Sequence, residues 1–147
     1  MLPSSVCKAA AVISVASAET VSVTFDTVYD DPSRSLSKVA CWRKGTGFMP
    51  KLDWKLQKDA VGFIGIDAIR AFSSAQCFSC WKIEYGDKHI SLFAIDSADS
   101  GIVLSLNAMQ SLTGGRAREL VRIDATATQI SLSNCGISAA DLYQYDF

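Results

Sequence analysis

The feature that most constrains the fold is a pair of cysteines placed directly before a hairpin pattern, in the stretch Cys77 to Ser97. Trp81 to Tyr85 alternates apolar and polar residues, as a half-buried strand does. Gly86-Asp87-Lys88 supplies turn residues, because glycine tolerates positive φ and aspartate accepts hydrogen bonds from its own backbone. Ile90 to Ile95 is a second strand-like run, and it ends on Asp96-Ser97. The stretch therefore predicts a hairpin that begins at cysteines and ends at a carboxylate.

The length of 147 residues predicts a single domain, residues 19–147, behind a leader. Residues 1–18 contain no acid, carry Lys8 as their one charge, and end in Ala16-Ser17-Ala18. That pattern resembles a secretion signal with an A-x-A cleavage site, and a disordered leader is the alternative. No apolar run is long enough for a membrane span. The net charge of −1 and the lack of a basic stripe argue against nucleic-acid binding.

The five cysteines are typical of a disulfide framework. Cys7 falls in the leader, which leaves an even set at Cys41, Cys77, Cys80 and Cys135. A redox role for the Cys77-x-x-Cys80 pair would need a helix that starts there, but a strand follows. A zinc site would need a second close pair of ligands. Two disulfides that leave the neighbouring cysteines in different directions are favoured, and spacing leaves the pairing open.

Short strands and long loops are predicted for the rest of the chain. Extended segments are expected at Val21–Tyr29, Val39–Trp42, Leu120–Asp124 and Thr126–Leu132, with Leu56–Phe72 left ambiguous between strand and one or two helical turns at Asp67–Phe72. A helix is expected at Ile102–Leu112, capped by Ser105 or Asn107 and ended by Gly114-Gly115. These elements predict a mostly β domain, with a closed barrel favoured because closure removes exposed strand edges.

The candidate site centres on Asp96, which is either a turn-former or a site residue at a barrel mouth. Glycoside hydrolysis would require a second carboxylate about 5 to 10 Å away. Asp26, Asp99 and Asp124 are available, but no spacing singles one out. His89, the single histidine, is interpreted as a turn residue. Trp81 is expected in the core, and Trp42 and Trp54 are expected to be exposed in polar loops.

Five segments taken in order carry a family resemblance. They are Val21-Ser22-Val23-Thr24-Phe25-Asp26-x-x-Tyr29, Ser37-Lys38-Val39-Ala40-Cys41, Cys77-x-x-Cys80-Trp81-Lys82-Ile83, Ile95-Asp96-Ser97 and Ile130-Ser131-Leu132-Ser133-Asn134-Cys135. In order and spacing they resemble the cerato-platanin family from Val21 to Cys135. The combination is specific, although each segment alone is weak.

The resemblance implies a six-stranded double-ψ β-barrel with one or two short helices and disulfides Cys41–Cys77 and Cys80–Cys135. It implies a small secreted fungal protein, not an enzyme and without a cofactor, that binds chitin oligomers or other wall polysaccharides in a shallow groove. Family members also gather at interfaces and provoke plant defences. Asp96, with Ser97 beside it, matches the groove aspartate, and Asp26 and Ile83 match positions near it.

The sequence departs from the family pattern in three places. Val103 stands where an asparagine that faces sugar is usual, and Ala98–Gly101 replaces a glycine-rich turn. The segment Trp42–Asp59 is unusually basic, and the tail after Gly136 is longer. The leading hypothesis is a non-hydrolytic wall-polysaccharide binder that elicits host defence, with host immune receptors as further partners.

Two alternatives stay open. The first is a surface-active or immunomodulatory protein without a sugar ligand, which would be a monomer that self-assembles at interfaces. Aromatic residues expected to be exposed at Trp42, Phe48 and Trp54 suggest it. An expansin-like wall-loosening protein is the other, and a hydrolytic version of it would need a second carboxylate that faces Asp96.

Overall fold

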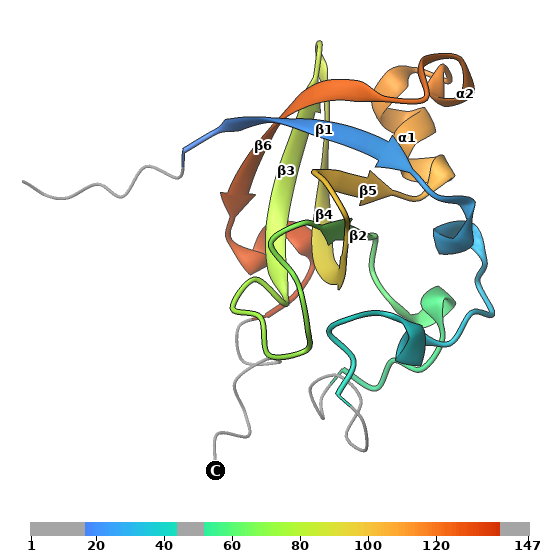
Figure 1. Ribbon diagram of the computed structural model, residues 1–147, viewed down its shortest axis with the longest axis vertical. Helices are drawn as coiled ribbons and strands as arrows, with labels where there is room; N and C mark the ends of the chain where they lie inside the picture. Colours follow the sequence, from blue (N-terminus) through green and yellow to red (C-terminus); the bar gives the residue numbers. More distant parts are fainter. Residues whose placement is uncertain (1–16, 44–51, 139–147) are drawn as a thin grey trace, which may run out of the picture.

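Six strands close into a barrel in the computed structural model, which describes residues 17–43 and 52–138 (Figure 1). The strands are β1 (Glu19–Phe25), β2 (Phe63–Ile66), β3 (Ser79–Tyr85), β4 (Lys88–Ser97), β5 (Ile102–Leu104) and β6 (Ile123–Ile130). Their order around the barrel is β1-β5-β2-β4-β3-β6. The pairs β1/β5 and β2/β4 are parallel, whereas the other pairs are antiparallel. The predicted six-stranded barrel is confirmed.

The predicted hairpin is present as β3 and β4. Ile83 pairs with Ile90 toward the interior, while Lys82 and Ser91 pair on the outer side. The chain reverses at Gly86, whose φ of +60° is a backbone conformation that favours glycine. Because side chains alternate between the two faces of a strand, this register buries the apolar set and exposes the polar one.

The opening strand is shorter than predicted. β1 ends at Phe25, and Thr27–Asp30 forms a 3-10 helix (η1). The Asp26 carboxylate accepts a hydrogen bond from the backbone N–H of Val28 at 3.0 Å, which caps this helix. Capping by aspartate favours the helical turn over continued strand, so the prediction that the strand reaches Tyr29 is wrong.

Two further segments differ from the predictions. Val39–Trp42 was expected to be extended, but it is a turn. The ambiguous Leu56–Phe72 contains the 3-10 helix Gln57–Asp59 and β2, and its last residues are turns and bends without a helix. All four β2 residues are buried. Strands β4 and β5 pair with its two edges, and the Tyr29 hydroxyl and the Ser97 carbonyl lie close over Gly65.

The predicted helix begins later than expected. Ile102–Leu104 is β5, and α1 covers only Leu106–Thr113. The Ser105 Oγ accepts from the Ala108 N–H at 3.0 Å as predicted for a cap, and Gly114, with a φ of +65°, ends the helix. A short apolar run does not distinguish strand from helix; here two partner strands, β1 and β2, decide it.

A second helix, α2 (Ala117–Leu120), occupies part of the segment read as a strand at Leu120–Asp124. Thus β6 begins at Ile123 and ends at Ile130, two residues before the predicted end. Helices α1 and α2 contact each other and lie at one corner of the barrel (Figure 1).

Both disulfides implied by the resemblance are present. Cys41 pairs with Cys77 at a Cα–Cα distance of 5.7 Å, and Cys80 pairs with Cys135 at 5.9 Å. They tie the start of the hairpin to the segment after η1 and to the segment after β6. The adjoining interior is apolar, with these fully buried side chains among others: Val23, Leu36, Ile64, Ile69, Ile83, Phe93, Ile95, Leu104, Met109 and Leu112.

Several predictions concern residues outside the described part of the chain. These are most of the leader, the middle of the basic segment Trp42–Asp59 with Phe48, and the end of the tail from residue 139. Within the described residues, no helix has the length and apolar character needed to cross a bilayer.

Candidate functional site

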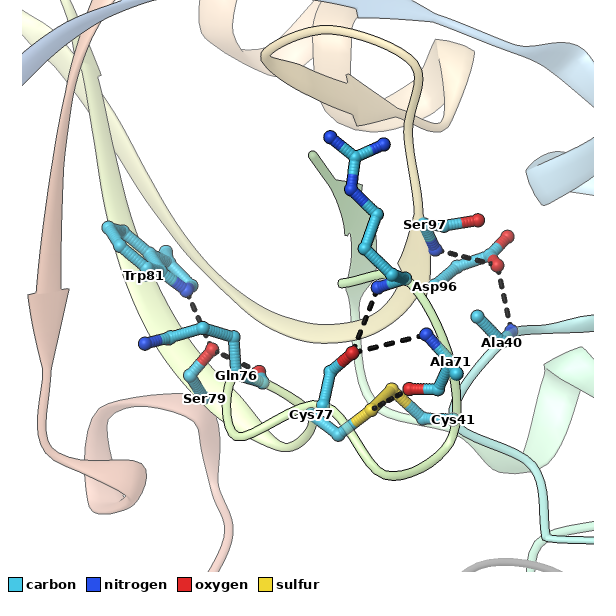
Figure 2. The surroundings of a disulfide bond; sticks show 11 residues. Ala40, Cys41, Ala71, Gln76, Cys77, Ser79, Trp81, Asp96 and Ser97 are labelled. Carbon is cyan, nitrogen blue, oxygen red and sulfur yellow. Dashed lines mark hydrogen bonds between the residues drawn. A yellow bond between two sulfur atoms is a disulfide. The ribbon is translucent and has the colours of Figure 1, made fainter. Parts of the chain in front are cut away.

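Asp96 lies near the end of β4, beside an irregularity in the pairing of β4 with β2 between Ile64 and Gly65. Such bulges redirect side chains and are common next to functional sites. The Asp96 Oδ2 accepts a hydrogen bond from the Tyr29 hydroxyl at 2.6 Å. Its Oδ1 accepts from the backbone N–H groups of Ala40 and Ser97, each at 2.8 Å (Figure 2). The half-exposed carboxylate therefore fixes η1 and the Ala40 turn against β4.

Tyr29 is the main partner of this carboxylate. Its ring packs edge-on against Phe63, with the ring centroids 5.1 Å apart. Burial of the phenol raises the pKa of Tyr29 far above its ordinary value, and the hydrogen bond to Asp96 raises it further. The hydroxyl consequently stays protonated at neutral pH and donates to Asp96.

Gly65 makes room for this arrangement. A Cβ at Gly65 would lie 2.7 Å from the Ser97 carbonyl oxygen and 2.8 Å from the Tyr29 hydroxyl oxygen. Any side chain here would push the Tyr29 hydroxyl away from Asp96 or separate β2 from β4. The absence of a side chain at Gly65 is thus part of the site.

Four residues lie side by side across neighbouring strands, and we call them the Asp96 row: Asp96, Gly65, Val103 and Thr24. Gly65 pairs with Asp96 in β4 and with Val103 in β5, and Val103 pairs with Thr24 in β1. Paired residues project to the same side of a sheet. Thr24, Val103 and Asp96 are half-exposed, whereas their sequence neighbours Val23 and Leu104 are buried. The row therefore presents a hydroxyl, an apolar side chain and a carboxylate on the outer surface of the barrel.

The other predicted site residues are placed differently. Ser97 is exposed directly beside Asp96, and Asp26 is exposed at the start of η1. Ile83 is fully buried, because it faces Ile90 and Ala127 inside the barrel. The prediction that Ile83 contacts sugar is therefore corrected, since its side chain belongs to the core.

The tryptophans are also less exposed than expected. Trp42 and Trp54 are half-buried and packed against the core, and Trp54 meets Phe93 edge-on with centroids 6.0 Å apart. Trp81 packs against the core as expected, and its Nε1–H donates to the Ser79 Oγ at 2.8 Å. These placements remove the exposed tryptophans that suggested a surface-active protein.

No hydrogen bond or ion pair joins the remaining candidates for chemistry to Asp96 within the described residues. His89 is a strand residue opposite Glu84, not a turn residue. Asp124 lies on β6, 4.0 Å from Arg122, and Asp99 is exposed in the turn after β4. In the described ranges, no group of three or more His, Cys, Asp or Glu side chains is arranged to hold a metal ion.

Sequence reasoning missed the two residues that shape the site, Tyr29 and Gly65. In the sequence, Tyr29 is only the last residue of the first segment that carries the family resemblance. Gly65 falls within the ambiguous segment Leu56–Phe72, and sequence reasoning assigned it no role. Glycine inside a strand pattern does signal a bulge or a close backbone approach, so Gly65 carried a usable signal, whereas the Tyr29–Asp96 contact spans 67 residues of sequence.

The fold and site define a class: a small β-barrel held by two disulfides, with a carboxylate fixed on its outer wall by a tyrosine and backbone amides. Such stapled domains are typical of oxidising compartments. A family model described as cerato-platanin matches residues 21–137. The chain belongs to the cerato-platanin family.

Known relatives agree with this membership. The chain is 35% identical to the heat-stable 19 kDa antigen of Coccidioides immitis over 123 residues, 82% of this chain and 84% of that protein. It is 34% identical to allergen Asp f 15 of Aspergillus fumigatus over 118 residues, 78% of this chain and 76% of that one.

Solved structures agree as well. The crystal structure of cerato-platanin 3 from M. perniciosa superposes with a TM-score of 0.74 at 30% identity, covering 81% of this chain and all of that one. The solution structure of the fungal elicitor cerato-platanin gives a TM-score of 0.66 at 28% identity, covering 78% and 96% of the two chains.

Proposed function

We propose that this protein is a secreted, non-hydrolytic binder of wall polysaccharide, such as chitin oligomers, and that it elicits host defence. The single observation that carries the proposal is the fixed, outward-facing carboxylate of Asp96 within the Asp96 row. The half-exposed carboxylate, with Ser97 exposed beside it, offers hydrogen-bond acceptors to sugar hydroxyls.

The row suits an extended ligand. Thr24 adds a hydroxyl that both donates and accepts, and Val103 adds an apolar contact for the C–H face of a sugar ring. Because Tyr29 and two backbone amides already hold Asp96, little side-chain freedom is lost when a ligand binds. Val103 in place of an asparagine removes one polar contact, so a shallow and weak site is expected.

The same hydrogen bonds argue for binding without bond cleavage. A glycosidase uses one carboxylic acid as a proton donor and a second carboxylate about 5 to 10 Å away. Asp96 accepts from three donors, so most of its hydrogen-bonding capacity is used in positioning and about one acceptor site remains for a ligand. Asp26 is occupied as the cap of η1, where it accepts from the Val28 N–H.

The role in host defence is proposed from the relatives. One structural neighbour is titled a fungal elicitor, and two sequence relatives are named as an antigen and an allergen. Secretion is supported by the two disulfides, which persist in oxidising environments.

The test is an NMR titration with chitin oligomers on the wild type, Asp96→Asn and Asp87→Asn. Asparagine keeps the shape of Asp96 and can accept from Ala40 N–H, while the Tyr29 hydroxyl turns to accept from the new amide. We expect amide shifts at Gly65, Ser97 and Val103 in the wild type and in Asp87→Asn, which changes only the exposed hairpin turn. These shifts should be strongly reduced in Asp96→Asn.

A Kd of about 1 mM is already weak binding. If the wild type shows no amide shifts at about millimolar ligand, sugar binding at this row is refuted. Release of reducing sugar from chitin that is lost in Asp96→Asn refutes the non-hydrolytic part. The elicitor part is tested separately by applying the folded protein to plant leaf tissue and measuring the oxidative burst. A response no greater than that to a heat-unfolded, reduced sample contradicts it.

A further inference from the structure

Phe72 is an aromatic side chain that the fold leaves outside its core. It lies in the segment between β2 and β3, and 50% of its surface is exposed. The Asp96 row does not use it. An exposed phenyl ring is unfavourable in water, so its position raises the question of what contacts it.

The turn that carries Phe72 is held rigidly. The Ser74 Oγ accepts from the backbone N–H groups of Arg70 and Ala71 at 2.9 and 3.1 Å, and the Ser74 N–H donates to the Ala71 carbonyl at 3.0 Å. The Cys77 N–H then donates to the Ser74 carbonyl at 3.1 Å. Cys77 in turn forms the disulfide with Cys41 (Figure 2). The ring is thus presented by a preorganised turn, which lowers the entropy cost of binding.

Arg43 completes the arrangement from the other side of the disulfide. Its Cζ lies 5.7 Å from the centroid of the Phe72 ring, a cation–π distance. A guanidinium held over a ring by a cation–π contact keeps its planar fork of N–H donors for a further ligand. No ion pair links Arg43 to an acid within the described ranges, and the same holds for Arg70 two residues before Phe72.

We propose that Phe72 and Arg43 form a contact site for the acidic sugar units of a uronic-acid polysaccharide. The C–H face of one uronic-acid ring packs on the exposed part of Phe72, and the carboxylate of an adjoining unit accepts two parallel hydrogen bonds from the Arg43 guanidinium. Neutral chitin supplies no carboxylate for this pair. The site extends the proposed function to a second class of ligand and does not require Asp96.

Local charge, not overall charge, must drive this contact. The chain has a net charge of −1, so an acidic polymer gains nothing from the protein as a whole. Binding should therefore depend on single cations beside Phe72 and should weaken as salt screens them.

The experiment is an NMR titration with oligogalacturonate, with fully methyl-esterified oligogalacturonate and chitin oligomers in parallel. We expect shifts at Arg43, Ala71 and Phe72 with the free acid, and an affinity that falls at least about threefold between about 20 and 200 mM salt. Phe72→Ala and Arg43→Gln should each weaken binding by about fivefold or more. Arg43→Lys keeps the charge but loses the planar fork, so we expect an intermediate affinity.

Val121→Ala is the matched control, because Val121 is 57% exposed and lies on α2's C-terminal side, away from this turn. Equal binding of the methyl ester, or unchanged affinity in both Phe72→Ala and Arg43→Gln, overturns the proposal. A third outcome also overturns it: oligogalacturonate gives no shift, but the wild type binds anionic phospholipid vesicles and both variants do not. That result would assign Phe72 and Arg43 to membrane binding. The chitin titration separates the two sites. If the wild type gives shifts with oligogalacturonate but none with chitin oligomers, sugar binding at the Asp96 row is refuted and this proposal stands.

Discussion

At the scale of single residues, Gly65 decides whether the Asp96 row can form. Alanine there places a Cβ 2.7 Å from the Ser97 carbonyl oxygen, which is backbone and cannot rotate away. We expect Gly65→Ala to lower the free energy of unfolding by about 2 kcal/mol, as overpacking does, and to shift the Ala40 and Ser97 amide resonances. Denaturant unfolding and NMR measure the two effects.

Gly62→Ala is the control for this substitution. A Cβ at Gly62 meets only the Leu92 Cδ2 at 2.6 Å, the flexible end of a side chain. We expect a cost below about 1 kcal/mol, because the leucine can change rotamer. Equal costs at the two positions contradict the role assigned to Gly65.

Tyr29 gives a prediction about alkaline pH. Burial and the bond to Asp96 raise its pKa in the folded state, whereas the unfolded chain titrates near the ordinary value of about 10. A raised folded pKa contributes stability that is fully present below the unfolded pKa and is lost as pH rises toward the folded pKa. Tyr29→Phe lacks this contribution and also loses the hydrogen bond.

We therefore expect Tyr29→Phe to be less stable than the wild type by about 1 to 2 kcal/mol at pH 7. The difference should shrink as pH rises above about 10. Urea unfolding of both proteins across that range measures it. A difference that stays constant with pH shows that the Tyr29 hydroxyl ionises as freely in the folded protein as in the unfolded chain.

At the scale of elements, Asp30 joins η1 to α1. Its two carboxylate oxygens accept from the Leu106 and Asn107 N–H groups at 2.7 and 2.9 Å, at the positive end of the helix. Asp30→Ala should lower the free energy of unfolding by about 1 to 2 kcal/mol, the usual cost of a lost cap. Thermal unfolding of Asp30→Ala is compared with that of Asp87→Ala, a substitution in the exposed hairpin turn that should change stability little. If the two variants lose the same stability, the capping role of Asp30 is refuted.

The helices and strands also show which structural features can be predicted from the sequence. The β3–β4 hairpin was predictable because its alternation and its glycine turn are local. The end of α1 was predictable because Gly114 is a local signal, and the Ser105 cap at its start was local too. The helix was still expected to begin at Ile102, because Ile102–Leu104 becomes a strand only when β1 and β2 supply hydrogen-bond partners.

At the scale of the molecule, the two disulfides restrain the barrel. They link residues 36 and 55 positions apart. In the chain-entropy description, loops of that length make each disulfide worth about 4 kcal/mol. We expect the double variant Cys80→Ala/Cys135→Ala to lose about that amount in denaturant unfolding, and Cys41→Ala/Cys77→Ala to lose a similar amount. A loss below about 1 kcal/mol shows that the unfolded chain is already compact.

The candidate site divides in the same way between sequence and fold. Asp96 and Ser97 were found at the end of a recognisable strand. Ile83 was misassigned because its match to a position in the family does not tell which face of the strand its side chain occupies. The pairing of Ile83 with Ile90 and Ala127 shows that it faces the interior. Tyr29 was missed because its contact with Asp96 bridges distant parts of the chain.

The sequence by itself determined the hairpin, the even set of cysteines, the helix caps and the likeness to one family, because each of these is written in local spacing and residue type. Only the tertiary structure decided that Ile102–Leu104 is a strand, that Ile83 is buried and that Tyr29 and Gly65 shape the Asp96 row. The physical reason is that strand pairing and burial are set by partners far along the chain, which close into contact only when the barrel does.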